Sequence, residues 1–243
     1  SVMNIYSNPE LYDSIHKGYN WDKNLIHSYA KKVNGSVLEI ASGTGRLTQT
    51  ILDLGLDYTG LEISKPFLDK AIDKYNNHAK FILGDMRNFH LNNKFDFIFI
   101  GFNSFLHNLT NLDAKKCLGC IKEHLSDNGR FLLSIFVPDP SFLNRESGNL
   151  YPATDFFKFQ NFRCRVMEKN QFDVKNQINN LTWYIEKNGE IDSKEYRFSM
   201  RMFYPHEMDI LLSEAGFYIN EKIGDYDGSS MDSESGMQIY VCQ

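Results

Sequence analysis

The stretch from Val37 to Arg46 limits the fold of this chain more than any other. It reads VLEIASGTGR: an apolar run, then a turn of small residues with Gly43 and Gly45, then the beginning of a helical pattern. Glycine admits positive φ angles and lets the backbone come close to a ligand. The helix expected from Arg46 to about Leu54 would point its free N–H groups at this loop. A strand, a tight loop and a helix in this order suit a nucleotide-like ligand, although plain strand–loop–helix units share the spacing.

Polar residues follow three further apolar runs. Glu62 ends the second run, Asp85 follows the third and Asn103 follows the fourth. Glu62 comes about 20 residues after the glycine turn, where a carboxylate can accept both hydroxyls of a ribose. Since ligands of open α/β sheets lie across the carboxyl ends of the strands, we expect these residues to converge on one site.

Strands and helices alternate through most of the chain, which predicts a doubly wound parallel sheet. Asp127-Asn128-Gly129 reads as a turn into the fifth strand. Near the end, Pro205 opens a helix that Gly216 ends with a left-handed cap, and two more strands follow. We therefore expect an α/β fold with a seven-stranded, mostly parallel sheet. The strands are expected at 36–41, 58–62, 79–83, 95–100, 129–137, 217–223 and 237–242, and the crossover helices at 46–54, 65–75 and 112–125.

Residues 138–203 interrupt this alternation and predict a small antiparallel β subdomain inserted into the fold. Asn188-Gly189 lies between two runs rich in aromatic and β-branched residues, which is a strong hairpin signal. The aromatic residues would form a small core, a homodimer face, or the wall or lid of a substrate pocket. The expected domains are a helical flap over 1–35, a sheet domain over 36–137 together with 204–243, and the inserted subdomain over 138–203.

Composition limits the class of protein. The chain has 243 residues, of which 42% are hydrophobic and 23% charged, which is ordinary for a globular protein. No apolar run approaches the roughly 20 residues that span a bilayer, and no basic-then-apolar leader opens the chain. The net charge of −5 argues against a surface that grips nucleic acid phosphates. We expect a cytoplasmic protein that does not enter membranes, with Ser1 as a processing remnant.

No metal site is expected. Cys117 and Cys120 have C-x-x-C spacing but fall in a helical pattern, and Cys164 and Cys242 offer no matching spacing for zinc. Four cysteines in a chain of this length do not form a disulfide framework either. The acidic stretch 225–234 lacks the ligand spacing of an EF-hand calcium loop and reads as a solvated hairpin loop.

These motifs together resemble the class I S-adenosylmethionine-dependent methyltransferases. The segment from Glu39 to Gly45 matches that family's acidic-x-Gly-x-Gly-x-Gly loop, with Ala41 in place of the first glycine, and Glu62 matches the ribose-binding acid. The resemblance implies a Rossmann-like methyltransferase fold and S-adenosylmethionine as the cofactor.

The same resemblance assigns further positions. Asp85-Met86 matches the pair in which a carboxylate takes the adenine amino group and the next backbone N–H meets a ring nitrogen, and 95–103 matches the region facing the donor methionine and the substrate. Related enzymes use an N-terminal Tyr-Asp segment as a flap over the cofactor. The residues expected to bind the cofactor are Tyr12, Tyr19, Glu39, Ala41, Gly43, Gly45, Arg46, Glu62, Ile63, Asp85, Met86, Arg87 and Asn103.

Methyl transfer from a sulfonium mainly requires that acceptor, methyl and sulfur be held in line and that water be excluded. A base helps where the acceptor is a hydroxyl or a protonated amine. His107, just past the fourth strand, is the candidate catalytic residue, with a surface histidine as the alternative reading. Tyr204 and His206 are weaker candidates on the substrate side.

The segment after the fourth strand limits the class of methyl acceptor, because it differs from that of one branch of the family. Methyltransferases that act on base amino groups carry Pro-Pro after the fourth strand, whereas the segment Gly101 to Phe105 has no proline, which disfavours a base-flipping enzyme. With the acidic charge balance, this favours an N or O atom of a small molecule. The inserted hairpins also resemble those of small-molecule methyltransferases, including sugar amine N-methyltransferases.

Three other functions compete with that of a small-molecule methyltransferase. An RNA or protein methyltransferase and a non-catalytic S-adenosylmethionine-binding protein stay open. A nicotinamide-dependent oxidoreductase is disfavoured because Thr48 stands where the third glycine of its fingerprint would be.

Overall fold

The computed structural model describes residues 2–243, so the expectation for Ser1 lies outside it. The chain forms two compact units. The first, called here the sheet unit, contains Asn20–Pro138 and Phe203–Gln243. The second, called the insert unit, contains the chain up to Tyr19 and Asp139–Met202. This division differs from the predicted segment 1–35, because its first part packs into the core of the insert unit and the rest into that of the sheet unit.

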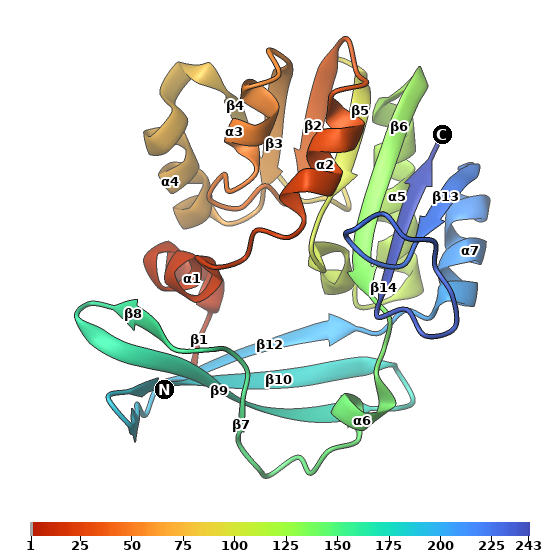
Figure 1. Cartoon of the computed structure of the whole chain (residues 1–243). Coiled ribbons are helices and arrows are strands. Elements are labelled where there is room, and N and C mark those ends of the chain that lie inside the picture. The colour runs from red at the N-terminus through yellow and green to blue at the C-terminus, as the bar shows by residue number, and fades with distance from the viewer. Residues whose placement is uncertain (1) are drawn as a thin grey trace. The chain divides into compact units, whose positions relative to one another are not determined.

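A seven-stranded sheet forms the centre of the sheet unit (Figure 1). The strands on both sides of the middle strand are parallel to it, and near one edge a single strand runs antiparallel to both of its neighbours. The expected doubly wound, mostly parallel α/β sheet is confirmed. Its order is β13 (Ile219–Ile223), β14 (Met237–Cys242), β6 (Leu125–Phe136), β5 (Phe95–Ile100), β2 (Ser36–Ile40), β3 (Asp57–Glu62) and β4 (Lys80–Leu83).

Side chains cap the first turns of the two longest helices of this unit. Ser64 accepts a hydrogen bond from the N–H of Phe67, and Thr110 accepts one from that of Asp113. Gly216, at φ +91°, gives the expected left-handed end of the last helix. The helices are α2 (Lys23–Ala30), α3 (Thr48–Leu52), α4 (Lys65–Tyr75), α5 (Asn111–His124) and α7 (Pro205–Glu214), with short 3-10 turns η2 (Asn76–His78) and η3 (Ser104–His107).

Several predicted boundaries differ from the structure by a few residues, and two of the differences have a clear structural reason. Helix α3 starts at Thr48 rather than Arg46, because Gly45 at φ +89° keeps the chain in a turn, in which the N–H of Thr48 donates to the Gly45 carbonyl. No separate turn precedes β6 at Asp127-Asn128-Gly129, since that strand already begins at Leu125. The extra residues form an irregularity opposite β5, where the register shifts.

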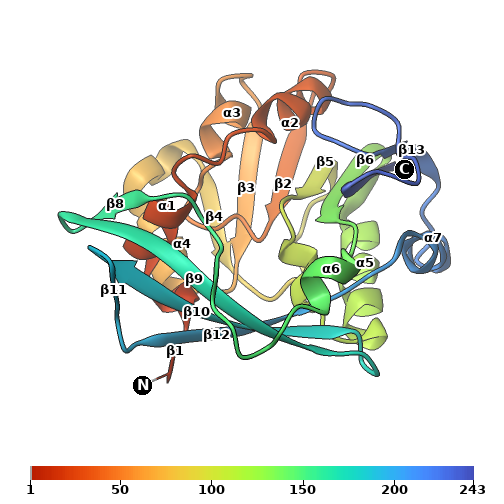
Figure 2. The same ribbon diagram turned by 60° about the horizontal axis from the view of Figure 1, so that its bottom comes forward.

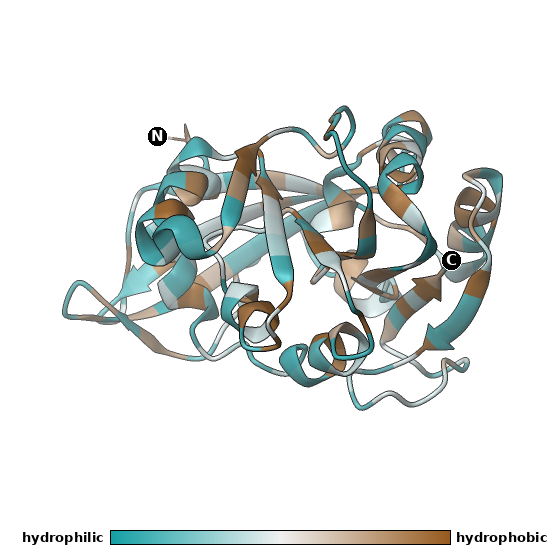
Figure 3. Ribbon diagram, turned by 90° about the horizontal axis from the view of Figure 1, so that it is seen from above, coloured by the Kyte–Doolittle hydropathy of each residue, from teal (hydrophilic) through white to brown (hydrophobic). Residues whose placement is uncertain are grey.

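Apolar side chains cover both faces of the sheet. Residues 97–100 of β5 are all fully buried, as expected for a strand covered on both sides. One core cluster joins α2 and α3 to β2, β5, β6 and β14, while α5 lies behind β6 in Figure 1. Figure 3 shows hydrophobic segments along the strands and helices that alternate hydrophilic and hydrophobic segments.

The insert unit is built on long antiparallel strands, as expected (Figure 2). Asn188 and Gly189 have φ angles of +47° and +87°, which form the predicted hairpin turn. Its core includes residues of the first helices as well as Cys164, Val166 and Tyr196. The strands are β1 (Val2–Met3), β7 (Tyr151–Pro152), β8 (Phe157–Phe159), β9 (Phe162–Asp173), β10 (Ile178–Lys187), β11 (Glu190–Ile191) and β12 (Glu195–Arg201), with η1 (Ile5–Ser7), α1 (Pro9–His16) and α6 (Pro140–Leu143).

Two general features bear on function. Within residues 2–243, every helix is too short or too polar to cross a membrane. Over the same residues, His, Cys, Asp and Glu side chains do not gather in groups that could hold a metal ion.

Candidate functional site

The loop of residues 41–47, called here the glycine loop, turns sharply at the end of β2. Ala41, Gly43 and Gly45 have φ angles of +56°, +63° and +89°. The left-handed conformation costs an L-residue about 1–2 kcal/mol but costs glycine almost nothing. The chain therefore keeps a left-handed backbone at Ala41, where the resembling family has glycine.

The two glycines of this loop have different roles. A Cβ atom at Gly45 would lie 2.7 Å from Cε2 of Tyr75, whose hydroxyl donates a hydrogen bond to the Gly45 carbonyl at 2.9 Å. A Cβ atom at Gly43 would meet nothing within 4 Å. Gly45 thus packs against α4, whereas the backbone at Gly43 is open to the approach of a ligand.

Glu62 joins the end of β3 to the glycine loop. Its Oε1 accepts the N–H of Gly43 at 2.9 Å, and its Oε2 accepts the N–H of Ser64 at 2.8 Å. Burial raises the pKa of Glu62, and the backbone N–H groups of Ser64, Gly43 and Ile63 oppose that rise. Each carboxylate oxygen has two lone-pair directions. A carboxylate fixed in this way keeps acceptor capacity for a pair of hydroxyl groups.

Gly60, which sequence reasoning did not single out, lets the glycine loop lie against β3. A Cβ atom there would lie 2.6 Å from Oγ of Ser42 and 2.9 Å from Cδ1 of Phe81. The N–H of Ser42 donates to the carbonyl of Leu61 at 3.0 Å. A glycine inside a predicted strand is a signal of such a close approach and could have led to this contact.

Glu39 and Arg46, both expected to bind the cofactor, each form a polar pair with another side chain. The hydroxyl of Tyr58 donates to Oε1 of Glu39 at 2.6 Å, and burial raises the pKa of Glu39 to about 8, against the lowering effects of Tyr58 and Arg46. Arg46 forms a bidentate ion pair, at 2.8 and 2.6 Å, with the carboxylate of Asp22, which is 2% exposed. Asp22 was missed because its partner is distant in the sequence.

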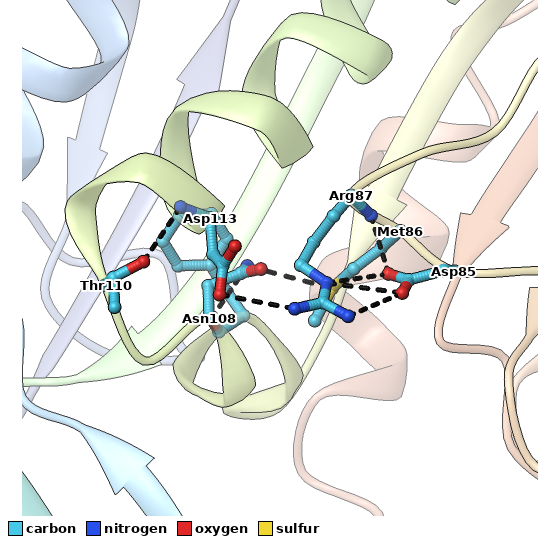
Figure 4. A network of polar contacts seen from close by, with 7 residues as sticks. Asp85, Met86, Arg87, Asn108, Thr110 and Asp113 are labelled. Atoms are coloured by element: carbon cyan, nitrogen blue, oxygen red, sulfur yellow. Dashed lines mark hydrogen bonds and ion pairs between the residues drawn. The ribbon is translucent and has the colours of Figure 1, made fainter.

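Asp85, Met86 and Arg87 form a turn after β4, closed by the N–H of Asn88 bonding to the Asp85 carbonyl (Figure 4). The Asp85 carboxylate accepts the backbone N–H of Arg87 at 2.9 Å and pairs with its guanidinium at 2.7 Å. The Arg87 guanidinium lowers the pKa of Asp85. The sulfur of Met86 lies 3.8 Å from Nδ2 of the buried Asn108.

The chain after β5 is held in an uncommon conformation. Phe102 and Asn103 have φ angles of +33° and +62°. Non-glycine residues in such conformations cluster at functional sites. Asn103 donates its N–H to the carbonyl of Ser134 at 3.1 Å and accepts the N–H of Phe136 with Oδ1 at 3.0 Å. Its carboxamide oxygen therefore ties β5 to β6, and His107 follows as the last residue of the half-buried turn η3.

The remaining expected residues fall into two groups. Ile63, directly after Glu62, is 64% exposed, and its contact with a cofactor stays a prediction. Tyr12 and Tyr19 belong to the insert unit, where Tyr12 stacks near Tyr6 and His16 and Tyr19 is buried. Their contact with a cofactor stays a prediction.

The chain is similar to known methyltransferases in sequence and in fold. A family model described as a methyltransferase domain matches residues 37–129. A protein of Anoxybacillus flavithermus named an uncharacterized methyltransferase is 28% identical over 144 residues, which are 59% of this chain and 63% of that protein. The chain thus spans less than two thirds of that relative.

Two solved structures are similar along nearly their whole length. The CcbJ methyltransferase from Streptomyces caelestis has a TM-score of 0.80 at 20% identity, covering 99% of this chain and 98% of its own. The sugar N-methyltransferase KedS8 from Streptoalloteichus has a TM-score of 0.72 at 14% identity, covering 93% and 89%. At these identities the likeness concerns the fold.

Residues 37–129 thus match a methyltransferase domain, and the whole chain has the fold of solved methyltransferases that use S-adenosylmethionine. Its residues fit the nucleoside half of that cofactor. Glu62 has acceptor capacity for ribose hydroxyls, Gly43 leaves open space beside it, and Ile63 and Asp85 follow the ends of adjacent strands.

Proposed function

We propose that this protein is an S-adenosylmethionine-dependent methyltransferase that acts on an N or O atom of a small molecule. The observation that carries the proposal is the carboxylate of Glu62, fixed by the N–H groups of Gly43 and Ser64 beside the open part of the glycine loop. This arrangement matches what a ribose requires at the end of the second strand of such a sheet. When bound, the cofactor supplies a methyl group already activated on a sulfonium.

The chain's own contribution to the reaction is mainly positional. Glu62 and the glycine loop would fix the donor's ribose, and Asp85 its adenine, so that the acceptor meets the methyl in one orientation. His107, on the turn after β5, is the group we propose to take a proton from a hydroxyl or ammonium acceptor. If so, His107→Ala should lower kcat most strongly below neutral pH, and an unchanged pH–rate profile would remove it from this role.

A small-molecule acceptor is favoured by two observations. The net charge of −5 is unfavourable for a nucleic acid partner. One structural neighbour is a sugar N-methyltransferase, which makes an amine on a sugar the first class of acceptor to test. The flap, lid or dimer roles of the insert unit stay predictions.

Calorimetric titration with S-adenosylmethionine and S-adenosylhomocysteine tests the proposal. Glu62→Ala and Asp85→Ala should each weaken binding by about 1–3 kcal/mol, the size of a lost hydrogen bond to a charged group. Asp69→Ala is the matched control, because it removes an exposed carboxylate paired only with Lys65 on α4. Unchanged affinity in both folded site variants would refute the site.

Turnover assays then separate the alternatives. Amino sugars and other small amines should be methylated, whereas RNA and basic peptides should not. Binding without turnover on any acceptor class would favour the non-catalytic S-adenosylmethionine-binding protein.

A further inference from the structure

Arg87 lies between two carboxylates that come from different parts of the sheet unit (Figure 4). Its Nη2 is 2.7 Å from Oδ2 of Asp85, and its Nη1 is 3.2 Å from Oδ2 of Asp113. The side chain of Arg87 is 42% exposed, so it is not needed to fill the core. Arg87 was expected to bind the cofactor itself, but its guanidinium is directed at these two carboxylates.

The Asp85 carboxylate is almost completely oriented by this one residue. Among the described residues, three N–H groups donate to it: the backbone N–H, Nε–H and Nη2–H of Arg87. The Nε–H is shared, at 3.0 Å from Oδ1 and 3.2 Å from Oδ2. A carboxylate has about four lone-pair directions. Three donors therefore leave the Asp85 carboxylate able to accept one further hydrogen bond. Because the carboxylate is ionised, it can accept that hydrogen bond but cannot donate one.

Asp113 anchors the guanidinium to a rigid element. It lies in the first turn of α5, and its N–H is capped by Oγ1 of Thr110 at 3.1 Å. A carboxylate at this end of a helix is also favoured by the helix dipole. Arg87 is therefore held from its far side, and its planar fork fixes the plane of the Asp85 carboxylate.

We infer that Arg87 is a positioning residue that makes Asp85 selective for a 6-amino purine, so that the site accepts adenosyl ligands and rejects 6-oxo ligands. The inference rests on the proposed function. The remaining lone pair of Asp85 suits the N–H of an exocyclic amino group, whereas the oxygen of a 6-oxo purine would face a carboxylate that has no proton to donate. The carboxylate oxygen of Asp85 and the 6-oxo oxygen would then both lack a hydrogen-bond donor, and unpaired polar groups of this kind make the discrimination between two ligands strong.

The test compares calorimetric binding of S-adenosylhomocysteine with that of its 6-oxo analogue, S-inosylhomocysteine. The wild-type chain should prefer S-adenosylhomocysteine at least about tenfold. Arg87→Met, which keeps the apolar stem without the donors, should lower the affinity for S-adenosylhomocysteine about tenfold and the preference about threefold or more. Asp113→Asn should lower the preference to a smaller extent, and Arg87→Lys should restore only part of it.

Lys115→Met is the matched control, since it removes a cation from α5 whose ion pair with Glu214 is exposed. It should leave both affinities unchanged. A merely structural role of Arg87 would weaken the two ligands equally and leave the preference intact, which would overturn the inference while the proposed function stands. Failure of the wild-type chain to bind S-adenosylhomocysteine would instead overturn the proposed function and this inference with it.

Discussion

Replacing Ala41 with glycine should stabilise the protein. Ala41 has a φ angle of +56°, and the left-handed conformation costs an alanine about 1–2 kcal/mol. Glycine removes that cost but adds about 0.4–1 kcal/mol of unfolded-state entropy to be lost on folding. The difference predicts that Ala41→Gly raises the free energy of unfolding by about 0.5–1 kcal/mol, which corresponds to about 1–4 °C in Tm for a chain of this size.

Urea unfolding followed by fluorescence measures this change, and Ala215→Gly provides the matched control in the same unit. Ala215 is half-buried like Ala41, but its φ is −77° and its ψ is −3°, an ordinary right-handed conformation. Ala215→Gly should therefore lower stability by about 0.5–1 kcal/mol. The two substitutions are chemically identical and have opposite expected signs. A loss of stability in Ala41→Gly equal to that in Ala215→Gly would refute the strain argument.

Two further predictions concern Glu39, near the end of β2, and the two glycines of the loop that follows it. Burial raises the pKa of Glu39 to about 8, so the folded state keeps a proton that the unfolded chain releases above about pH 4.3. The free energy of unfolding should therefore fall as the pH rises between these two pKa values, by up to about 1.4 kcal/mol per pH unit. Glu39→Gln should remove that slope in urea unfolding at several pH values, and a stability difference between the two proteins that stays constant with pH would contradict it. Gly45→Ala should lower the free energy of unfolding by about 2–4 kcal/mol, through backbone strain and the clash with Tyr75. Gly43→Ala should lower it by only about 1 kcal/mol of strain but should impair cofactor binding. Equal losses of stability in the two variants would contradict the different roles of the two glycines.

The alternating strands and helices of the sheet unit were predictable because they depend on local signals. The short apolar runs, the caps at Ser64 and Thr110 and the Asn188-Gly189 turn each fix a nearby backbone conformation, and the rules of parallel β–α–β connection then leave few topologies. The predicted start of α3 failed for a related reason. A glycine with φ +89° continues the turn, and nothing in the sequence states that φ.

The sequence by itself determined the α/β fold class and the strand ends where the candidate site lies, because the glycine turn and the acidic residues at successive strand ends lie a fixed distance apart along the chain. The tertiary structure alone decided which contacts the residues around these strand ends make. It brought Arg87 to Asp113 and paired Arg46 with Asp22. It also packed Gly45 against Tyr75 and left the backbone at Gly43 open. These outcomes depend on distances between residues far apart in the chain, which spacing does not encode and which only the packing of helices on the sheet establishes.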